Sequence, residues 1–312
     1  MDMSASVELP VDWDVSVRAA LAESPRPELA DGSLQPLGAG MDSVALLLEH
    51  AGVGHVLRLP QSLDGADGIA REARLLPELA LRLPLPIPGF LFTAPNPLGP
   101  GRFCVYPAVP GDSLSVAEWE RRGIARTPDA VRVLAELIDA LHGFPVDRAR
   151  ELGIETADPR GDFAEDLDAV RAEVIPLLPA PEARALLAAW EGYLADDANF
   201  AYRPTLLHSD ISLDHLLVTD TRITGLIDFG DTEIGDPAYD LAYLYPEAGP
   251  AFVRRVQQAR GADLDPGLER KLRFWACADP ARDVLHGIEN DLPDFGAERL
   301  AVLTDTIRRF HL

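Results

Sequence analysis

The chain has a single lysine, Lys271, among its 312 residues, and acidic residues outnumber basic ones by 51 to 28. The resulting formal net charge of −23 argues against a nucleic-acid partner, because binding to a phosphate backbone needs clustered Lys and Arg. Surplus acids can simply keep a surface solvated, but they also suit a cationic ligand. Because acids gather at residues 162–173 and 279–294, we expect a small-molecule cationic substrate.

Cysteines and long apolar runs are also scarce. The two cysteines, Cys104 and Cys277, lie in segments that we expect in different parts of the fold, which argues against a disulfide or a cysteine metal site. No stretch approaches eighteen uninterrupted apolar residues, and residues 1–14 have neither a basic nor an apolar leader pattern. We expect a cytoplasmic monomer with no membrane span. A length of 312 residues suits two lobes.

Two acidic motifs stand close together within residues 207–235. Asp210 lies in H-S-D-I-S-L-D-H, and the chain then runs through a short hairpin at residues 216–227 that ends in Asp228-Phe229-Gly230. Because a hairpin returns its ends to one edge, we expect Asp210, His215 and Asp228 to converge. Asp210 is the candidate base for a substrate hydroxyl. Asp228 suits Mg²⁺, which is commonly held by one or two carboxylates together with substrate phosphates.

This segment resembles the kinase-like antibiotic phosphotransferases, whose pattern is H-x-D-x-x-x-x-[N/H], then I-D-[F/W]-G-[D/E], then G-D-P-x-x-D-L-A. The third piece is present at residues 235–242. The resemblance implies Mg²⁺-dependent transfer of a nucleotide γ-phosphate to a hydroxyl, with Asp210 as base and with Asp228 and His215 at the metal. Histidine departs from the oxygen preference of Mg²⁺ and can act through water. His208 is expected to brace the loop, and Asp236 and Asp240 to act in helix capping and packing.

The implied fold is α+β and bilobal, like that of protein kinases. The N-lobe, residues 1–107, would be an antiparallel β-sheet plus a helix, and the larger C-lobe, residues 108–312, would be mainly helical. The expected strands cover residues 34–37, 43–49, 55–60, 85–92 and 102–106. The expected C-lobe helices include residues 163–178, 181–194, 250–260, 266–277 and 295–310.

The resemblance also implies a nucleotide site in the N-lobe. Gly38, Gly40 and Ser43 form a glycine loop between two strands, where backbone N–H groups would approach phosphates. This loop lacks the context of a Rossmann or P-loop motif. The cation on the third strand, usually Lys, must here be Arg58, paired with Glu72 on the following helix.

The segment after the last strand is expected to be the hinge that binds the purine. Pro107 and Val109 would lie against the base, with the bulky Tyr106 just before them. A large residue at that position occurs in relatives that use GTP, so both ATP and GTP remain open as phosphate donors.

Within the family, the chain looks closest to the aminoglycoside 2″-phosphotransferases, through His215 and through the turn His286-Gly287-Ile288-Glu289. We therefore expect an aminoglycoside as substrate and antibiotic resistance as the outcome, with Asp231, Asp279, Asp283 and Glu289 binding the substrate amines. A macrolide phosphotransferase, which would need an apolar cleft, and a small-metabolite kinase of the same fold are the alternatives. A non-catalytic pseudokinase is disfavoured because both Asp210 and Asp228 are present.

Overall fold

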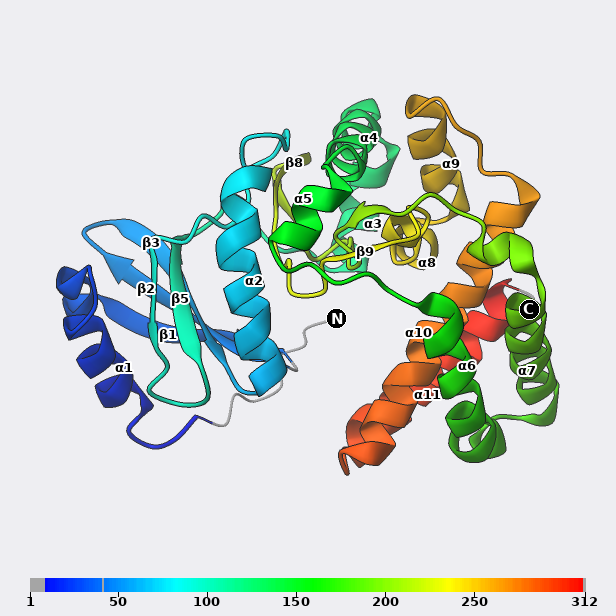
Figure 1. Ribbon diagram of the computed structural model, residues 1–312, viewed down its shortest axis with the longest axis horizontal. Helices are drawn as coiled ribbons and strands as arrows, with labels where there is room; N and C mark the ends of the chain where they lie inside the picture. Colours follow the sequence, from blue (N-terminus) through cyan, green and yellow to red (C-terminus); the bar gives the residue numbers. More distant parts are fainter. Residues whose placement is uncertain (1–8, 41, 311–312) are drawn as a thin grey trace. The chain divides into compact units, whose positions relative to one another are not determined.

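The computed structural model describes residues 9–40 and 42–310, and these form two compact units that are interleaved in sequence (Figure 1). Among the described residues, unit 1 comprises those up to Ile124, with Asp147–Ile154 and Leu213–Thr232. Unit 2 comprises Ala125–Val146, Glu155–Ser212 and the residues from Glu233 onward. The expected lobe boundary at residue 107 stays a prediction. No helix in these described ranges combines the length and apolar character needed to cross a membrane.

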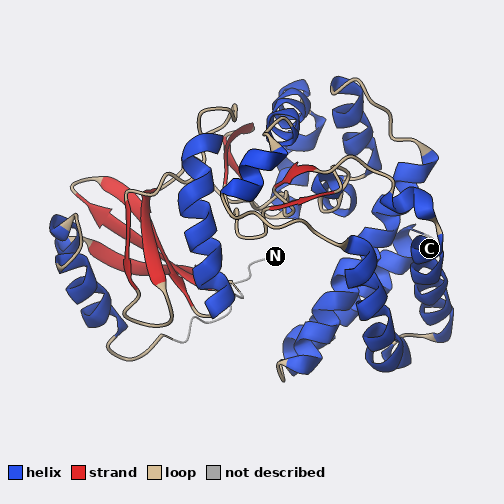
Figure 2. Cartoon of the chain, viewed as in Figure 1, coloured by secondary structure: helices blue, strands red, loops and turns tan. Residues whose placement is uncertain are grey.

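Unit 1 contains a five-stranded antiparallel sheet in the order β1-β2-β3-β5-β4 (Figure 2). Its strands are β1 (Ser33–Ala39), β2 (Ser43–His50), β3 (Val53–Pro60), β4 (Phe92–Pro95) and β5 (Arg102–Pro107). Alternate residues of β2 are buried, as expected for a strand with one face against a core. β5 is buried on both faces along its middle.

A helix covers each face of this sheet, which explains the two-sided burial of β5. On one face, Val17 and Leu21 of α1 (Trp13–Ala22) join a core with Leu46, Leu57 and Phe103. The opposite face bears a smaller buried cluster of Ile69 from α2 (Leu63–Leu79) with Cys104 and Tyr106. Every second side chain along β3 and β5 therefore points toward α2, and Arg58 is one of them.

The expected strand at residues 85–92 is wrong. The fourth strand begins at Phe92, and the segment before it has no regular structure. Pro84, Pro86 and Pro88 explain the difference, because proline has no N–H to donate to a strand ladder. The carbonyl of Pro86 accepts a hydrogen bond from the backbone N–H of Leu226 instead, at 3.1 Å.

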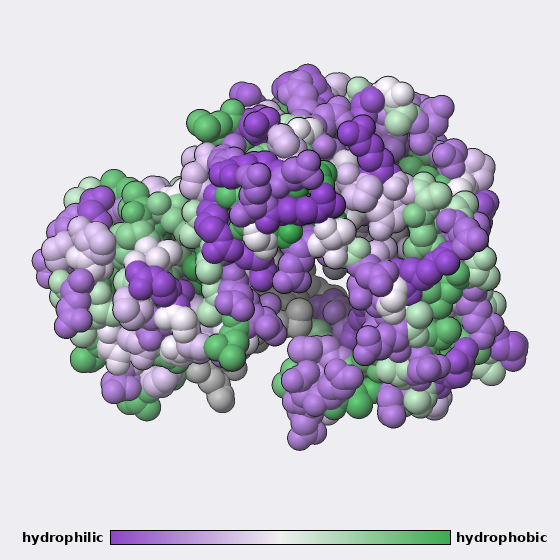
Figure 3. Space-filling view, viewed as in Figure 1, coloured by the Kyte–Doolittle hydropathy of each residue, from purple (hydrophilic) through white to green (hydrophobic). Residues whose placement is uncertain are grey.

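Unit 1 also holds the hairpin that the sequence predicts, β7 (Leu216–Thr219) and β8 (Arg222–Leu226), with Asp220 at a positive φ in the turn. Two short helices, α3 (Val116–Arg122) and α5 (Val146–Glu151), complete it. Hydrophilic side chains gather over α5 (Figure 3), where Arg148 pairs with Glu78 of α2.

Unit 2 is mainly helical, apart from the two-stranded sheet of β6 (Thr205–Leu207) and β9 (Glu233–Gly235). Its α-helices are α4 (Pro128–His142), α6 (Pro159–Ala169), α7 (Ala180–Ala195), α8 (Leu244–Ala248), α9 (Pro250–Ala259), α10 (Pro266–Glu289) and α11 (Pro293–Phe310). Aromatic rings fill its core, with Tyr193 of α7 stacked on Phe274 of α10 at 4.1 Å between centroids. These rings fix α10 against α7.

Helix α10 extends twelve residues beyond the expected end at Cys277 and passes through Pro280. Proline in a helix interior loses a hydrogen bond and usually ends or kinks the helix. Here Ala281, Val284 and Leu285 are buried after the proline, and α10 packs along α11. Burial of these apolar side chains offsets the cost of the proline. As a consequence, Asp279 and Asp283 lie on a continuous helix.

Candidate active site

In unit 1, Arg58 of β3 and Glu72 of α2 form a buried ion pair. Arg58 Nη1 donates to both carboxylate oxygens of Glu72 at 2.8 Å, and the two side chains are 14% and 2% exposed. Burial alone would lower the pKa of Arg58, but Glu72 and then Asp228 outweigh it and raise that pKa above its usual range. The guanidinium therefore remains charged. The sequence predicted this pairing, and its role toward a nucleotide stays a prediction.

Asp228 lies beside the same arginine, and His215 lies beside Asp228. Arg58 Nη2 is 3.7 Å from Asp228 Oδ1, and His215 Nε2 is 3.7 Å from Asp228 Oδ2. The backbone N–H of Ile227 donates to the carbonyl of His215 at 3.1 Å, which ties the two segments together. Asp228 has a φ of +65°, a strained conformation that is common at functional sites.

The donor set at Asp228 fits a magnesium ion. Its carboxylate is 49% exposed, so oxygen atoms are accessible to a ligand from solvent. One carboxylate is a usual protein contribution to a Mg²⁺ site that nucleotide phosphates and water complete. His215 would add a nitrogen donor or hold a water of the ion. Among the residues that the structure describes, no group of three or more His, Cys, Asp or Glu could hold a metal by itself.

The glycine loop joins β1 to β2. Gly40 N–H donates to the carbonyl of Ser43 at 3.0 Å, and Met41 lies outside the described residues. A Cβ at Gly38 would meet nothing within 4 Å, so packing does not require glycine there. The Ser43 hydroxyl is buried with no hydrogen-bond partner in the described part of the chain. The assignment of Gly38, Gly40 and Ser43 to phosphate binding stays a prediction.

The expected hinge follows β5. Tyr106 is 5% exposed and stacks on Phe90 at 5.7 Å between ring centroids, so it belongs to the cluster between the sheet and α2. Pro107 ends β5 at an exposed position. Val109 lies against β8, where a Cβ on Gly225 would stand 2.4 Å from its Cγ1. Purine binding by this segment stays a prediction.

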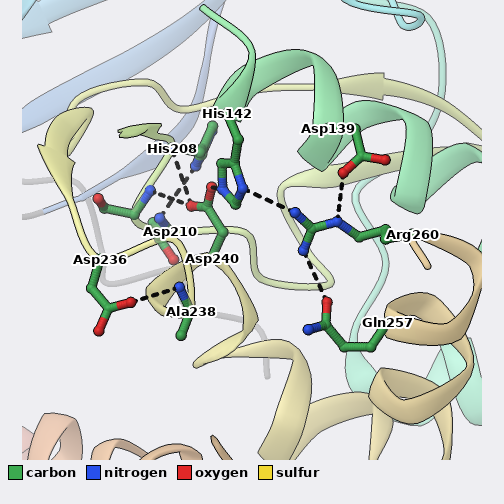
Figure 4. Close-up of polar contacts among 10 residues, drawn as sticks. Asp139, His142, His208, Asp210, Asp236, Ala238, Asp240, Gln257 and Arg260 are labelled. Atoms are coloured by element: carbon green, nitrogen blue, oxygen red, sulfur yellow. Dashed lines mark hydrogen bonds and ion pairs between the residues drawn. The ribbon is translucent and has the colours of Figure 1, made fainter. Parts of the chain in front are cut away.

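Unit 2 contains Asp210 on a loop that a buried aspartate holds (Figure 4). Asp240 Oδ1 accepts the backbone N–H groups of His208 at 3.0 Å and Ser209 at 2.9 Å. Asp210 N–H donates to His208 Nδ1 at 3.3 Å, so His208 braces the loop as the sequence indicated. Ser209 has a φ of +69°, a left-handed conformation that costs about 1–2 kcal/mol. The two bonds to Asp240 hold this strained turn.

The structure gives Asp240 a larger role than the sequence suggested. We expected capping and packing, but its carboxylate orders the loop of the candidate base and also contacts His142, whose Nε2 is 2.9 Å from Asp240 Oδ2. His142 was missed because it lies 98 residues away on α4, with no local motif around it. Asp236 does not cap the 3-10 turn at Tyr239–Leu241, whose N-cap is Ala238 without a side-chain bond. Its Oδ1 accepts Ala238 N–H at 3.0 Å within the preceding turn, and it also pairs with Lys271.

Two of the four candidate substrate carboxylates lie near Asp210. Burial raises the pKa of Asp279 to about 7. The Arg282 guanidinium and the hydrogen bond from the Tyr239 hydroxyl oppose this shift, whereas the carboxylates of Asp283 and Asp210 add to it. Burial also raises the pKa of Asp283, with Arg299 opposing and Asp210 adding. Asp279, Asp283 and Asp210 therefore form a group of mutually repelling carboxylates within unit 2.

The other two candidates are placed differently. Glu289 is exposed at the C-terminal end of α10, and Asp231 is exposed in unit 1, directly after Gly230. The substrate-binding roles of Asp231, Asp279, Asp283 and Glu289 stay predictions.

The chain matches known proteins over most of its length. Residues 33–275 match the profile described as Phosphotransferase enzyme family. A solved APH(2″) enzyme in complex with GDP and kanamycin is 29% identical, with a TM-score of 0.84 over 95% of this chain and 99% of that one. The macrolide 2′-phosphotransferase MphH from Brachybacterium faecium is 27% identical, with a TM-score of 0.70 over 94% and 98%. Protein YcbJ of Bacillus subtilis is 27% identical over 64% of this chain and 66% of its own length.

These similarities confirm the predicted kinase-like α+β fold and the resemblance to antibiotic phosphotransferases.

Proposed function

The chain belongs to the phosphotransferase enzyme family, and from that membership we propose that it transfers the γ-phosphate of a nucleoside triphosphate to a hydroxyl of an aminoglycoside antibiotic. The observation that carries this proposal is the loop of Asp210. A partly buried carboxylate at the end of a strained turn, fixed through two backbone N–H groups, is suited to orient one acceptor hydroxyl and to take its proton.

The nucleotide half of the reaction belongs to unit 1. Arg58, kept charged and oriented by Glu72, presents its second guanidinium nitrogen for a phosphate oxygen. Asp228 and His215 would hold Mg²⁺, which supplies charge neutralisation of the phosphates when bound. The backbone of Pro107 to Val109 would receive the base, and either ATP or GTP can serve as donor. A GDP-bound relative of similar fold supports a guanine nucleotide as one option.

The carboxylates of unit 2 favour an aminoglycoside over other acceptors. Asp283, and Asp279 once it ionises above about pH 7, add negative charge near Asp210, which matches a substrate that carries several ammonium groups. The likeness to a kanamycin complex supports this substrate class. The macrolide phosphotransferase of similar fold makes a macrolide the second candidate. Phosphorylation of the antibiotic would confer resistance.

We also place the reaction in the cytoplasm. Nucleoside triphosphates are available there, and the two buried thiols of Cys104 and Cys277, which form no disulfide, suit a reducing compartment. A monomer would suffice, because each proposed residue belongs to one chain.

The test is a coupled assay of the purified protein with ATP and with GTP, across aminoglycosides, macrolides and small hydroxyl metabolites. Asp210→Asn should lower kcat about 100- to 10,000-fold while nucleotide binding persists, because the variant loses the proton acceptor. Asp214→Asn, an exposed neighbour, is the matched control and should keep parental turnover. Full kcat in Asp210→Asn would remove Asp210 from the mechanism, and turnover of metabolites alone would exclude the antibiotic.

A further inference from the structure

A chain of side-chain contacts within unit 2 leads from helix α9 to the loop of Asp210 (Figure 4). Arg260, at the end of α9, donates from Nε to Asp139 Oδ1 at 2.8 Å and from Nη1 to Gln257 at 2.9 Å. Its Nη2 lies 3.0 Å from Nδ1 of His142, and His142 Nε2 lies 2.9 Å from Asp240 Oδ2. The imidazole therefore stands between a guanidinium and a buried carboxylate.

The partners of the two ring nitrogens indicate how the imidazole is hydrogen-bonded. A guanidinium has only donors, so Nδ1 of His142 must accept the hydrogen bond from Arg260. Nε2 then carries the single ring proton and donates it to Asp240. A doubly protonated ring would point an N–H at the N–H of Arg260. The ring thus contacts Asp240, from the segment after β9, and Arg260, directly after α9, which in turn pairs with Asp139 of α4.

We propose that Arg260 and His142 are positioning residues for Asp210, because Arg260 holds His142 as a neutral Nε2–H imidazole that in turn orients Asp240. The inference rests on the proposed function in taking Asp210 as the base. Asp240 is 1% exposed, and rotation of its carboxylate would release the N–H groups of His208 and Ser209 together. The left-handed Ser209 would then relax, and the Asp210 carboxylate would move with it.

Arg260→Met tests the proposal, since methionine keeps an apolar stem of similar length but donates no hydrogen bond. We expect kcat to fall about 10- to 100-fold, with nucleotide KM near parental, because a small misplacement of the base slows transfer without weakening binding. Arg254→Met on α9 is the matched control, since Arg254 is exposed and its Nη2 lies 3.9 Å from Glu269 Oε2. This variant should keep the parental kcat. Parental kcat in Arg260→Met would overturn the proposal.

Asp139→Asn separates positioning from simple helix pairing. Asparagine keeps an acceptor for Arg260 while removing the α4 to α9 ion pair, so the contact between Arg260 and His142 should persist and kcat should remain near parental. A loss equal to that of Arg260→Met would show that the ion pair alone matters, and it would refute the role of the imidazole.

Two measurements by NMR do not depend on turnover, so they distinguish failure of this inference from failure of the proposed function. The ¹⁵N shifts of the His142 ring in the parent should report a neutral ring protonated at Nε2, and a protonated or Nδ1–H ring would contradict the proposal. In Arg260→Met, amide exchange should accelerate at His208 and Ser209 but not in the aromatic core around Phe274. Unchanged exchange at both amides would also contradict it.

Discussion

At the scale of single residues, the Arg58–Glu72 pair joins two buried charges that depend on one another. Removal of Arg58 leaves the buried Glu72 without its partner, and removal of Glu72 leaves Arg58 with Asp228 alone, so the losses should be non-additive. We expect Arg58→Ala to raise the nucleotide KM and to lower kcat, and Glu72→Ala added to it to cost little more. Steady-state kinetics of the double-mutant cycle measures this. Arg102→Ala, an exposed arginine of β5, is the control, and fully additive losses would show that the two residues act independently.

A second residue-scale prediction concerns Asp279, whose pKa burial raises to about 7. The carboxyl is then neutral at lower pH and anionic above about 7, so KM for a cationic acceptor should fall as pH rises through that value. Asp279→Asn should abolish this step. A pH profile of acceptor KM for both proteins tests it, and an unchanged step in the variant would assign the ionisation to another group.

The same shift makes a prediction about stability. The folded-state pKa lies above the unfolded value of about 3.9, so the folded state holds the proton more tightly and loses stability as pH rises from about 4 to about 7. Asp279→Asn cannot ionise and should therefore gain Tm relative to the parent at about pH 8 more than at about pH 5. Thermal unfolding at the two pH values measures the difference, and an equal Tm offset at both would rule out the shift.

The sequence predicted candidate catalytic residues, but it did not predict the residues that hold their loops in place. Asp210 and Asp228 were recognisable because their neighbours in the chain form motifs, and Arg58 and Glu72 because a strand and the next helix supply them at a known spacing. His142 and Arg260 gave no such signal, since each contact that matters spans about a hundred residues or more. A side chain that acts through tertiary hydrogen bonds has no local sequence pattern that would identify it.

At the scale of elements, helix and strand interiors were predictable from periodicity, and their ends were decided by proline and packing. Strand β4 begins only at Phe92 because the prolines before it cannot donate to a strand ladder. Helix α10 continues through Pro280 because buried apolar residues follow that proline. The effect of one proline thus depends on the tertiary contacts of its neighbours, which the sequence alone does not show.

The packing of α10 on α11 yields an element-scale prediction. A Cβ on Gly287 would stand 2.9 Å from Gly296 Cα, a backbone atom that cannot move without moving α11. Gly287→Ala should therefore lower Tm, although alanine is the better helix former by about 1 kcal/mol. Gly192→Ala on α7, where a Cβ meets nothing within 4 Å, should instead hold or raise Tm. Equal shifts for the two variants would show that the helices do not meet this closely.

At the scale of the whole molecule, a net charge of −23 adds a long-range attraction for any polycation to the local carboxylates. This attraction should weaken as salt screens it, whereas binding of a monocationic macrolide should change little. Many of the acids are already paired with arginines, as Asp166 is with Arg282 on α10. The net charge already counts these arginines, so the pairs do not lower it, but the field that a substrate meets depends on where the remaining acids lie.

Removing one negative charge at each of three places separates the effect of location from the effect of total charge. Asp283 lies near Asp210, Glu289 is exposed at the end of α10, and Asp305 of α11 is 84% exposed and serves as the control. If the candidate carboxylates bind the substrate amines as proposed, Asp283→Asn should raise the aminoglycoside KM most at low salt, Glu289→Gln less, and Asp305→Asn least. Added salt should shrink these differences, because screening acts on every exposed charge. If all three variants match the parent at low salt and KM is independent of ionic strength, the acids only solvate the surface, and the aminoglycoside assignment loses its electrostatic basis.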